Sequence, residues 1–176
     1  LNGTNTSAVK TTDRFDQLEN AYSFNTSSYV HVPHNSLLNL TSNFSLLAWI
    51  YPTNLTGQEL QGIISKYNST GASTYTFRLS NGNLNLAGAS SPSCSAPVTA
   101  NQWALATAKI HTSNTADLYL NGAKVCSITN MGISTKADPL KIGNDYNNSR
   151  GFFGKIDDVR IYDRVLSNEE IQAFYA

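Results

Sequence analysis

Residues 152–175 constrain the fold more than any other stretch of this chain. From Ile156 to Tyr162, β-branched and aromatic residues alternate with charged ones, which is typical of a strand with one buried face. A helix start signal follows, because Ser167 and Glu170 have the spacing of a capping box. One strand and one short helix cannot enclose a core, so the rest of the chain must supply the sheets that bury them.

Short strand patterns fill most of the remaining chain. The strongest covers residues 44–51, where both faces are apolar, which indicates a central strand covered on both sides or one face lining a groove. Asn-Gly pairs at Asn81 and Asn121 each indicate a hairpin turn. Further strands are predicted at residues 21–24, 29–32, 62–67, 75–79, 84–87, 103–111, 117–120, 124–128 and 140–142. This pattern predicts an all-β fold, an antiparallel two-sheet jelly-roll sandwich with one short C-terminal helix.

A length of 176 residues suits one domain with its own core. Residues 1–17 are polar without an apolar period, so they are predicted to form an N-terminal arm or edge segment, and residues 18–176 the jelly-roll domain. The chain starts at Leu1 without a signal peptide, which we interpret as a mature, processed or excised segment. No apolar run approaches the roughly 20 residues that span a bilayer, so membrane insertion is not expected.

The charge balance bears on the partners. Lys plus Arg and Asp plus Glu both number 12, so bulk charge indicates neither nucleic acid nor an anionic membrane as a partner. Charged residues make up only 14% of the chain, and Asn, Ser and Thr are abundant, which favours an extracellular or cell-surface β protein.

Eight Asn-x-Ser/Thr sequons permit N-glycosylation in a secreted protein. They begin at Asn2, Asn5, Asn25, Asn39, Asn43, Asn54, Asn68 and Asn147. A surface that is simply rich in Asn, Ser and Thr explains the same residues without glycans.

Two interpretations are open for Cys94 and Cys126. They form a disulfide in an oxidising compartment, or they are two free, small apolar side chains.

Several stretches in order resemble the laminin-G-like, concanavalin A-like jelly-roll family, and the match runs from about Thr11 to Tyr175. The stretches are residues 21–24 (AYSF), 33–52 (PHNSLLNLTSNFSLLAWIYP), 62–66 (GIISK), 101–103 (NQW), 118–122 (LYLNG), 140–143 (LKIG) and 153–162 (FGKIDDVRIY). Such modules are mostly non-catalytic and extracellular. The resemblance therefore implies adhesion or assembly at a cell surface or in a matrix, with glycans or extracellular proteins as partners.

The resemblance also implies a structural calcium ion between an aspartate of the last long strand and carbonyl groups of the first hairpin. The matching residues here are Asp157, Asn25, Asp16 and Asp13. Family members usually have Asp-Gly or Asn-Gly at the hairpin, whereas this chain has Asn25-Thr26. The alternative for the aspartates is a salt bridge with Arg160 or Arg14, or exposure to solvent.

Members similar to this sequence usually carry a further strand upstream of the segment that matches residues 2–4. Either an upstream part has been cut away, or the sandwich has an open slot. An open slot exposes unpaired backbone and an apolar groove, which a strand from another copy would fill by β-augmentation. The resulting hypothesis is a structural subunit of a glycosylated extracellular fibril that polymerises by strand exchange.

A polar loop at residues 143–150 contains the candidate ligand-binding residues Asp145, Tyr146, Asn147 and Arg150. Aromatic faces stack on sugars, and Asn and Asp side chains form hydrogen bonds with hydroxyl groups, so these residue types suit a shallow lectin-like site. Any polar loop contains the same residue types, and this simpler interpretation also remains open.

Catalysis has little support in the sequence. Enzymes that share this sandwich and cut glycans need two carboxylates about 5–10 Å apart across a groove. The chain has only four glutamates and no Glu-x-Asp-x-x-Glu pattern. Asp157 and Asp158 are adjacent, so in a regular strand their side chains point to opposite faces. We therefore predict no catalytic residue, and a glycoside hydrolase is the least supported alternative.

Overall fold

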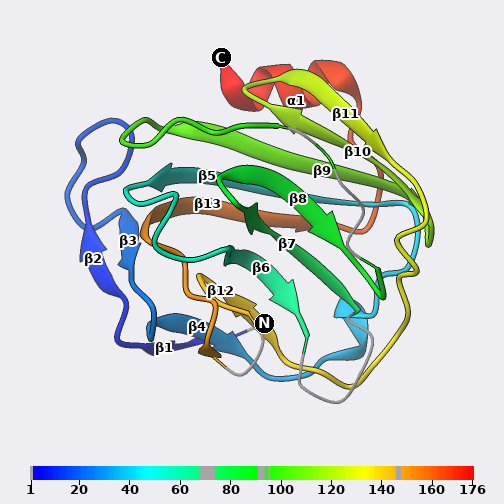
Figure 1. The fold of residues 1–176 in the computed structure, drawn as a ribbon, viewed down its shortest axis with the longest axis horizontal. Helices are drawn as coiled ribbons and strands as arrows, with labels where there is room; N and C mark the ends of the chain where they lie inside the picture. Colours follow the sequence, from blue (N-terminus) through cyan, green and yellow to red (C-terminus); the bar gives the residue numbers. More distant parts are fainter. Residues whose placement is uncertain (1, 68–73, 91–93, 95, 146–147) are drawn as a thin grey trace.

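The computed structural model describes residues 2–67, 74–90, 94, 96–145 and 148–176, and two antiparallel sheets form its layers (Figure 1). The six-stranded sheet has the order β1 (Thr4–Thr6), β4 (Tyr29–Val32), β12 (Leu140–Ile142), β6 (Leu60–Lys66), β7 (Tyr75–Ser80) and β8 (Asn83–Ala87). The seven-stranded sheet has the order β11 (Ala123–Ile128), β10 (Thr115–Leu120), β9 (Ala104–Thr112), β5 (Phe44–Pro52), β13 (Gly154–Tyr162), β3 (Ala21–Phe24) and β2 (Val9–Thr11). The helix α1 (Asn168–Tyr175) and the short 3-10 helix η1 (Ser36–Leu38) complete these elements. The predicted all-β sandwich with a short C-terminal helix is confirmed.

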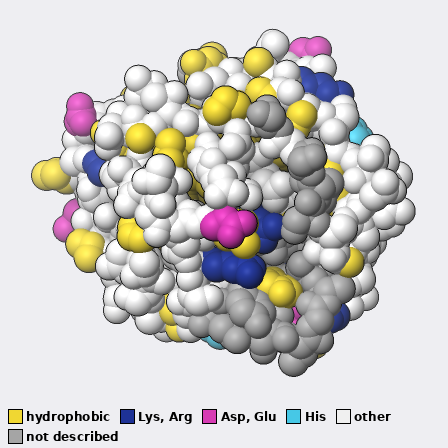
Figure 2. Space-filling view, viewed as in Figure 1, with side chains coloured by type: hydrophobic (Ala, Val, Ile, Leu, Met, Phe, Trp, Pro, Cys, Tyr) yellow, Lys and Arg dark blue, Asp and Glu magenta, His cyan; other side chains and the backbone are white. Residues whose placement is uncertain are grey.

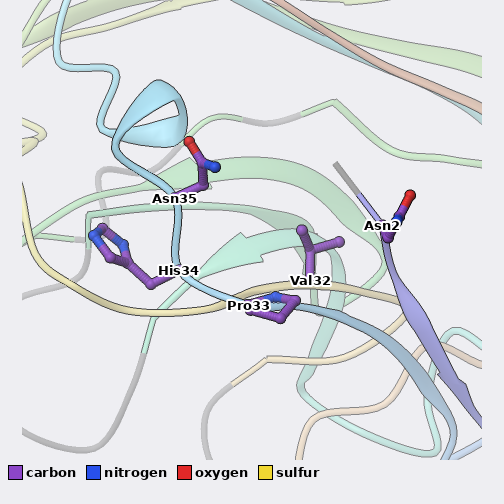
Figure 3. Close-up of a pocket in the computed structure, with 5 residues that line it drawn as sticks. All are labelled: Asn2, Val32, Pro33, His34 and Asn35. Atoms are coloured by element: carbon purple, nitrogen blue, oxygen red, sulfur yellow. The ribbon is translucent and has the colours of Figure 1, made fainter.

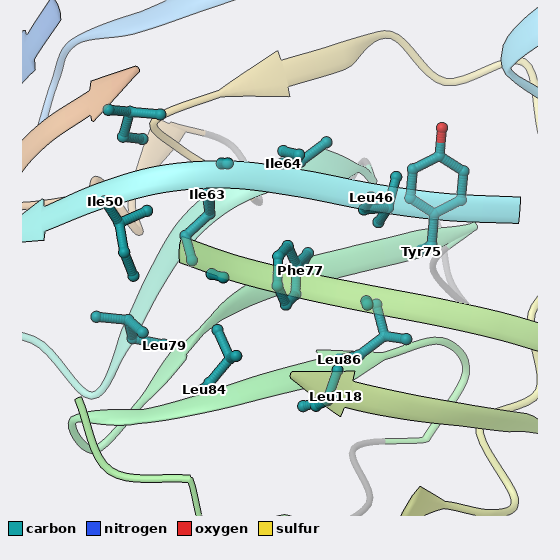
Figure 4. Close-up of a cluster of buried hydrophobic side chains, with 14 of the residues drawn as sticks. Leu46, Ile50, Ile63, Ile64, Tyr75, Phe77, Leu79, Leu84, Leu86 and Leu118 are labelled. Atoms are coloured by element: carbon teal, nitrogen blue, oxygen red, sulfur yellow. The ribbon is translucent and has the colours of Figure 1, made fainter. Parts of the chain in front are cut away.

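The core lies between the two sheets, because alternate residues of each central strand point inward. Figure 4 shows Leu46 and Ile50 of β5 together with Ile63 and Phe77 of the opposite sheet. All four side chains are fully buried. Burial of one such side chain stabilises the fold by about 1.5–3 kcal/mol, so this apolar layer holds the sheets together.

The opposite face of β5 is also covered, which confirms the interpretation of residues 44–51 as a strand with two apolar faces. Leu47 and Trp49 point away from the core between the sheets and join a second apolar cluster with Leu166 and Ile171. Ile171 lies in α1 and is fully buried, so the helix covers the outer side of the seven-stranded sheet.

The start of α1 follows the predicted capping box. The Ser167 hydroxyl accepts a hydrogen bond of 3.2 Å from the Glu170 backbone N–H, and the Glu170 carboxylate accepts one of 2.8 Å from the Ser167 backbone N–H. The guanidinium of Arg164 also forms a bidentate pair with Glu170, at 2.8 and 2.6 Å. These contacts fix the helix start where Ile171 reaches its buried position.

None of the helices in the described part of the chain is long and apolar enough to cross a bilayer.

Residues 1–17 contribute the two short strands β1 and β2, one at an edge of each sheet. β1 pairs with β4 and β2 pairs with β3, so the chain crosses from one sheet to the other between them. The crossing is fixed by Asn5, whose side chain donates a hydrogen bond to the carbonyl of Ala8 and accepts one from its N–H.

A disulfide joins Cys94 to Cys126 in the structure. Their Cα atoms are 6.2 Å apart, within the range that disulfides usually span. Cys126 belongs to the edge strand β11, and Cys94 lies in the segment between β8 and β9. The bond therefore ties this connecting segment to an edge of the seven-stranded sheet.

We expect Ile171→Ala to reduce the free energy of unfolding by about 2–4 kcal/mol, because it leaves a cavity between α1 and the sheet. Urea denaturation followed by circular dichroism measures this change. Gln172→Ala is the matched control, since Gln172 is the exposed neighbour on the same helix, and it should stay within about 0.5 kcal/mol of the wild type. Equal effects of the two substitutions would contradict the packing role of the helix.

Candidate functional site

The outer face of the six-stranded sheet has polar side chains in rows across the strands. The strand register aligns His31 with Lys141, Lys141 with Ser65, and Ser65 with Thr76. The hydroxyl groups of Ser65 and Thr76 lie 3.3 Å apart and share a hydrogen bond. Ile64, Tyr75 and Phe77, which adjoin them along the strands, point into the apolar core, so the alternation of the strands turns Ser65 and Thr76 away from it. Both side chains are nevertheless buried.

A second row contains the charged residue Arg78 of β7. Gly62 is in register with Arg78, and Arg78 is in register with Asn85. The Arg78 guanidinium donates a hydrogen bond of 3.2 Å from Nε to the side-chain oxygen of Asn85. Toward the other edge of the sheet, the Lys141 ammonium lies 5.5 Å from the centre of the Tyr29 ring.

The loop after β12 lies across this row because Asn144 fixes both of its ends. The buried Asn144 side chain accepts hydrogen bonds from the backbone N–H groups of Asp145, at 2.9 Å, and of Arg150, at 3.1 Å. It also donates one of 3.2 Å to the carbonyl of Thr26. A Cβ atom on Gly62 would lie only 2.5–2.7 Å from the backbone of Asn144 and Asp145, so glycine is what lets the loop approach β6.

Asp145 is the electrostatic centre of the site. Its side chain is fully buried, with Arg78 Nη1 at 3.9 Å from Oδ2 and Arg150 Nε at 3.8 Å from Oδ1. Within the described part of the chain, neither carboxylate oxygen has a hydrogen-bond partner. Burial raises the pKa of Asp145 to about 6, although the charges of Arg150, Arg78 and Lys141 act in the opposite direction.

This arrangement suits recognition of a polar ligand. A carboxylate accepts hydrogen bonds from hydroxyl groups, guanidinium groups donate them, and both become stronger where water is excluded. Figure 2 shows basic side chains beside an acidic one on the surface over β6 and β7, in the orientation of Figure 1; this acidic side chain is not Asp145, which is fully buried.

The family follows from the comparison of this chain with known sequences. A model of the concanavalin A-like lectin/glucanases superfamily matches residues 24–172. The chain belongs to this superfamily. No curated protein sequence matches it significantly.

Solved structures with the same fold come from several bacterial proteins. Domain 4 of AbnA, a GH43 extracellular arabinanase from Geobacillus stearothermophilus solved in complex with arabinotriose, is 18% identical with a TM-score of 0.78, covering 99% of this chain and 88% of that one. The receptor-binding domain of botulinum neurotoxin mosaic serotype C/D is 20% identical, with a TM-score of 0.75 and coverages of 99% and 46%. The binding domain of Paraclostridial Mosquitocidal Protein 1 is 19% identical, with a TM-score of 0.72 and coverages of 98% and 46%. This chain therefore spans about half the length of the toxin domains.

Two of the four predicted ligand-binding residues, Asp145 and Arg150, lie together in this member of the superfamily. Tyr146 and Asn147 fall outside the described residues. The sequence interpretation missed Arg78, although the alternation of polar residues with the buried residues of β7 was a signal for it.

The residues predicted to bind calcium serve other contacts. The Asp13 carboxylate accepts hydrogen bonds from the backbone N–H groups of Phe15, at 2.8 Å, and Gln17, at 2.9 Å. Asn25 uses its side-chain oxygen in the same way within its own turn. Asp16 adopts a left-handed conformation with a φ of 59°, in the turn that Asp13 closes.

The fourth residue, Asp157, forms a salt bridge with Arg14. Arg14 Nη1 lies 3.2 Å from Asp157 and 3.0 Å from Asp158, so it holds both carboxylates. The expectation that these two side chains point to opposite faces was wrong, because the strand has an irregularity here and Asp158 has a φ of 46°.

Calcium binding fits these contacts poorly. No group of three His, Cys, Asp or Glu side chains among the described residues is arranged to hold a metal ion. The donor oxygens named above accept hydrogen bonds from their own turns or pair with Arg14. Calcium binding stays a prediction from the resemblance, and calorimetric titration of CaCl₂ into protein treated with EDTA tests it.

The sequon asparagines that the structure describes are mostly accessible. Asn2, Asn5, Asn25, Asn43 and Asn54 are exposed, whereas Asn39 is half-buried. Asn68 and Asn147 lie outside the described residues. Glycosylation of any of these side chains stays a prediction.

A hollow of about 420 Å³ lies beside the end of β4 (Figure 3). It is lined by Asn2, Val32, Pro33, His34 and Asn35. The Asn35 side chain already accepts a hydrogen bond of 2.9 Å from the Leu37 N–H, where it caps η1. Because the described residues of this lining include no carboxylate, Lys or Arg, they offer a ligand weaker electrostatic contacts than the charged cluster around Asp145.

An apolar slot of about 290 Å³ opens between the sheets, lined mainly by side chains of β3, β4, β12 and β13. Tyr22, Val30, Ile142 and Val159 are only partly buried there. The open-slot hypothesis requires an apolar groove and also unpaired backbone, whereas β3, β4, β12 and β13 each pair with a strand on both sides. Occupation of the slot by a strand of another copy stays a prediction.

We expect Asp145→Asn to change the pH dependence of stability. The folded-state pKa of about 6 exceeds the ordinary value of 3.8, so the native state binds more protons than the unfolded state between these pH values. Wild-type stability should therefore fall as the pH rises from 4 to 6, by on the order of 3 kcal/mol from this group. Urea denaturation from pH 4 to pH 8 should show the variant gaining stability over the wild type across that range.

Asp117→Asn is the matched control in the seven-stranded sheet. Burial acts to raise the pKa of Asp117, but hydrogen bonds from Lys124, Ser127 and His111 outweigh it and lower the pKa. The sign is therefore reversed, and this variant should lose stability relative to the wild type as the pH rises. Parallel pH profiles for the wild type and Asp145→Asn would show that the Asp145 carboxyl titrates as it does in the unfolded chain.

Proposed function

We propose that this chain is a non-catalytic extracellular module that binds glycans on the outer face of its six-stranded sheet, in adhesion or assembly at a cell surface or in a matrix. The observation that carries the proposal is the buried Asp145 carboxylate, whose oxygens lack hydrogen-bond donors among the described residues. An unsatisfied buried carboxylate is costly, so its presence here marks a position held for a purpose other than stability. Because Asp145 is itself fully buried, a sugar would meet the half-buried Arg150 and Lys141, whose charges act on Asp145.

The accessible part of the polar rows lies on β4 and β12. His31 and Lys141 are half-buried, whereas Ser65 and Thr76 are buried, so a sugar would meet β4 and β12 and not β6 or β7. The half-buried Tyr29 offers an aromatic ring on the same face. The complex of AbnA domain 4 with arabinotriose is consistent with sugar binding on this fold, although likeness at 18% identity carries the fold and not the ligand.

Two features favour binding without catalysis. The Asp145 carboxylate lies between two arginines, whereas a glycosidase needs a second carboxylate across the sugar. The adjacent carboxylates of Asp157 and Asp158 both pair with Arg14, on a strand of the other sheet.

A glycan array with the purified chain, followed by calorimetry on the strongest hit, tests the proposal. We expect Asp145→Ala to weaken binding at least tenfold, because the buried carboxylate lies 3.8 Å from Arg150 Nε and helps to position the guanidinium that would contact the ligand. Asp117→Ala removes the same charge from the other sheet and should leave the affinity unchanged. The proposal fails if no glycan binds, or if both substitutions weaken binding equally.

Assembly of copies through the apolar slot between the sheets is a second candidate function, which the partly buried apolar lining of that slot favours. Tyr22→Asp would place a charge in this lining. If copies assemble by strand exchange, electron microscopy should show filaments of the wild type and none of the variant. A wild type that sediments as a monomer at every concentration would exclude this route.

A further inference from the structure

We infer that two copies of this chain pair reciprocally, each inserting an apolar knob, Phe15 and Leu18, into the apolar slot of the other. The slot is the one lined mainly by side chains of β3, β4, β12 and β13. This inference goes beyond glycan binding and does not rest on it. It also differs from strand exchange, because side chains fill the slot and no backbone pairing is needed.

The first argument is the exposure of the knob. In the connection between β2 and β3, Leu18 is 80% exposed and Phe15 is 65% exposed. Figure 2 shows apolar side chains that project at the edge of the molecule where Figure 1 places this connection. Val9, on the preceding strand β2, is also largely exposed. Single exposed apolar side chains are common on proteins, but several large ones in one short segment indicate an interaction surface.

The second argument is that a fixed turn keeps the knob out of its own slot. The Asp13 carboxylate accepts hydrogen bonds from the backbone N–H groups of Phe15, at 2.8 Å, and Gln17, at 2.9 Å. It also accepts one of 3.2 Å from the side-chain amide of Asn20. These hydrogen bonds hold the chain on both sides of Leu18, whose side chain stays in solvent. A side chain that is held in place before binding loses little conformational entropy on association.

The third argument is that the knob and the slot belong to one surface patch. Asn20 lines the slot, and Leu18 is two residues before it, so their Cα atoms are at most about 7 Å apart. Arg14 forms salt bridges with Asp157 and Asp158, which also line the slot. A patch that contains both a knob and a slot is self-complementary, so two copies related by a two-fold axis make both contacts at once. The assembly therefore closes as a dimer and does not extend into a filament.

The fourth argument is the fit of the knob to the slot. The slot has a volume of about 290 Å³, roughly twice that of an apolar cavity of about 150 Å³ that holds benzene in another protein. One or two side chains of the size of Leu and Phe therefore fit. Because Tyr22, Val30, Ile142 and Val159 in the lining are only partly buried, an incoming side chain would remove apolar surface from water. The strands around the slot already pair on both sides, which leaves side chains and not backbone as the contact.

Sedimentation of the purified chain over a concentration series tests the inference. We expect a monomer–dimer equilibrium with a dissociation constant on the order of micromolar, because the contact is smaller than the interface of an obligate dimer. No species larger than the dimer should form. Because the contact is apolar, ammonium sulfate should strengthen it, and NaCl should not abolish it.

Leu18→Asp places a charge on the knob at an exposed position, so the fold of the monomer should not change. We expect each damaged contact to weaken association at least about tenfold. The variant should therefore pair with wild-type copies at least about tenfold more weakly and with itself at least about a hundredfold more weakly, because its own dimer contains the substitution twice. Leu37→Asp is the matched control, since Leu37 is 74% exposed and lies on η1, and it should leave dimerisation unchanged.

A mixture of two variants separates reciprocal insertion from other kinds of self-association. Tyr22→Asp damages the slot and keeps the knob, whereas Leu18→Asp damages the knob and keeps the slot. Neither variant alone forms a dimer with an intact contact, so each should be monomeric. Mixed, they should form a heterodimer through the intact knob of one copy and the intact slot of the other. Thermal unfolding checks that Tyr22→Asp folds, and if it does not, the titration of Leu18→Asp with wild type decides the question.

Every outcome bears on the inference. A wild type that stays monomeric at every concentration overturns it, and so do equal effects of Leu18→Asp and Leu37→Asp. Filaments or a series of larger species overturn the closed dimer and favour strand exchange. Glycan binding by Leu18→Asp should equal that of the wild type below its dimerisation concentration, so failure of the dimer and failure of glycan binding are separate results.

Discussion

Burial of both faces of β5 is the constraint on which the rest of this structure depends. Its inner face contributes to the core between the sheets. Its outer face carries Leu47 and Trp49, and these apolar side chains must also be shielded from water. The helix α1 provides this shielding, because its buried residue Ile171 packs in the same apolar cluster on the outer side of the seven-stranded sheet. The two outer faces of the sandwich therefore differ, because the helix covers part of one while polar side chains occupy the other.

The site on that polar face has an energetic cost that the neighbouring structure offsets. A buried carboxylate without hydrogen-bond donors destabilises a fold, and it persists only where other contacts hold it in place. Asn144 holds it by bonding to the backbone at both ends of the loop, and Gly62 lets that loop lie against β6. Such local cost at a well-fixed position is expected where a site is preorganised for a ligand.

The sequence predicts the long elements of this fold and only part of its site. An apolar run at residues 44–51 identifies β5, alternation from Ile156 to Tyr162 identifies β13, and the capping box identifies α1, because these signals are local. β1 and β2 have three residues each, which is too short for a period to appear. Asp145 and Arg150 were found because they share one polar loop, whereas the position of Arg78 beside them depends on strand register. Register, and the irregularity that turns Asp158 toward Arg14, are set by tertiary contacts.

Membership of the superfamily leaves the ligand open, because a sandwich of this kind supports many sites on one backbone. What distinguishes a member is the set of side chains along the outer rows of the sheet and in the loops that cross them. In this chain the rows contain hydroxyl and amide groups, and charge gathers around one carboxylate. Since the chain has no net charge, that concentration cannot reflect a general attraction to anions. Under the proposed function it would act only on a ligand that binds beside the loop after β12, so its effect would be selectivity at one site and not adhesion by the whole surface.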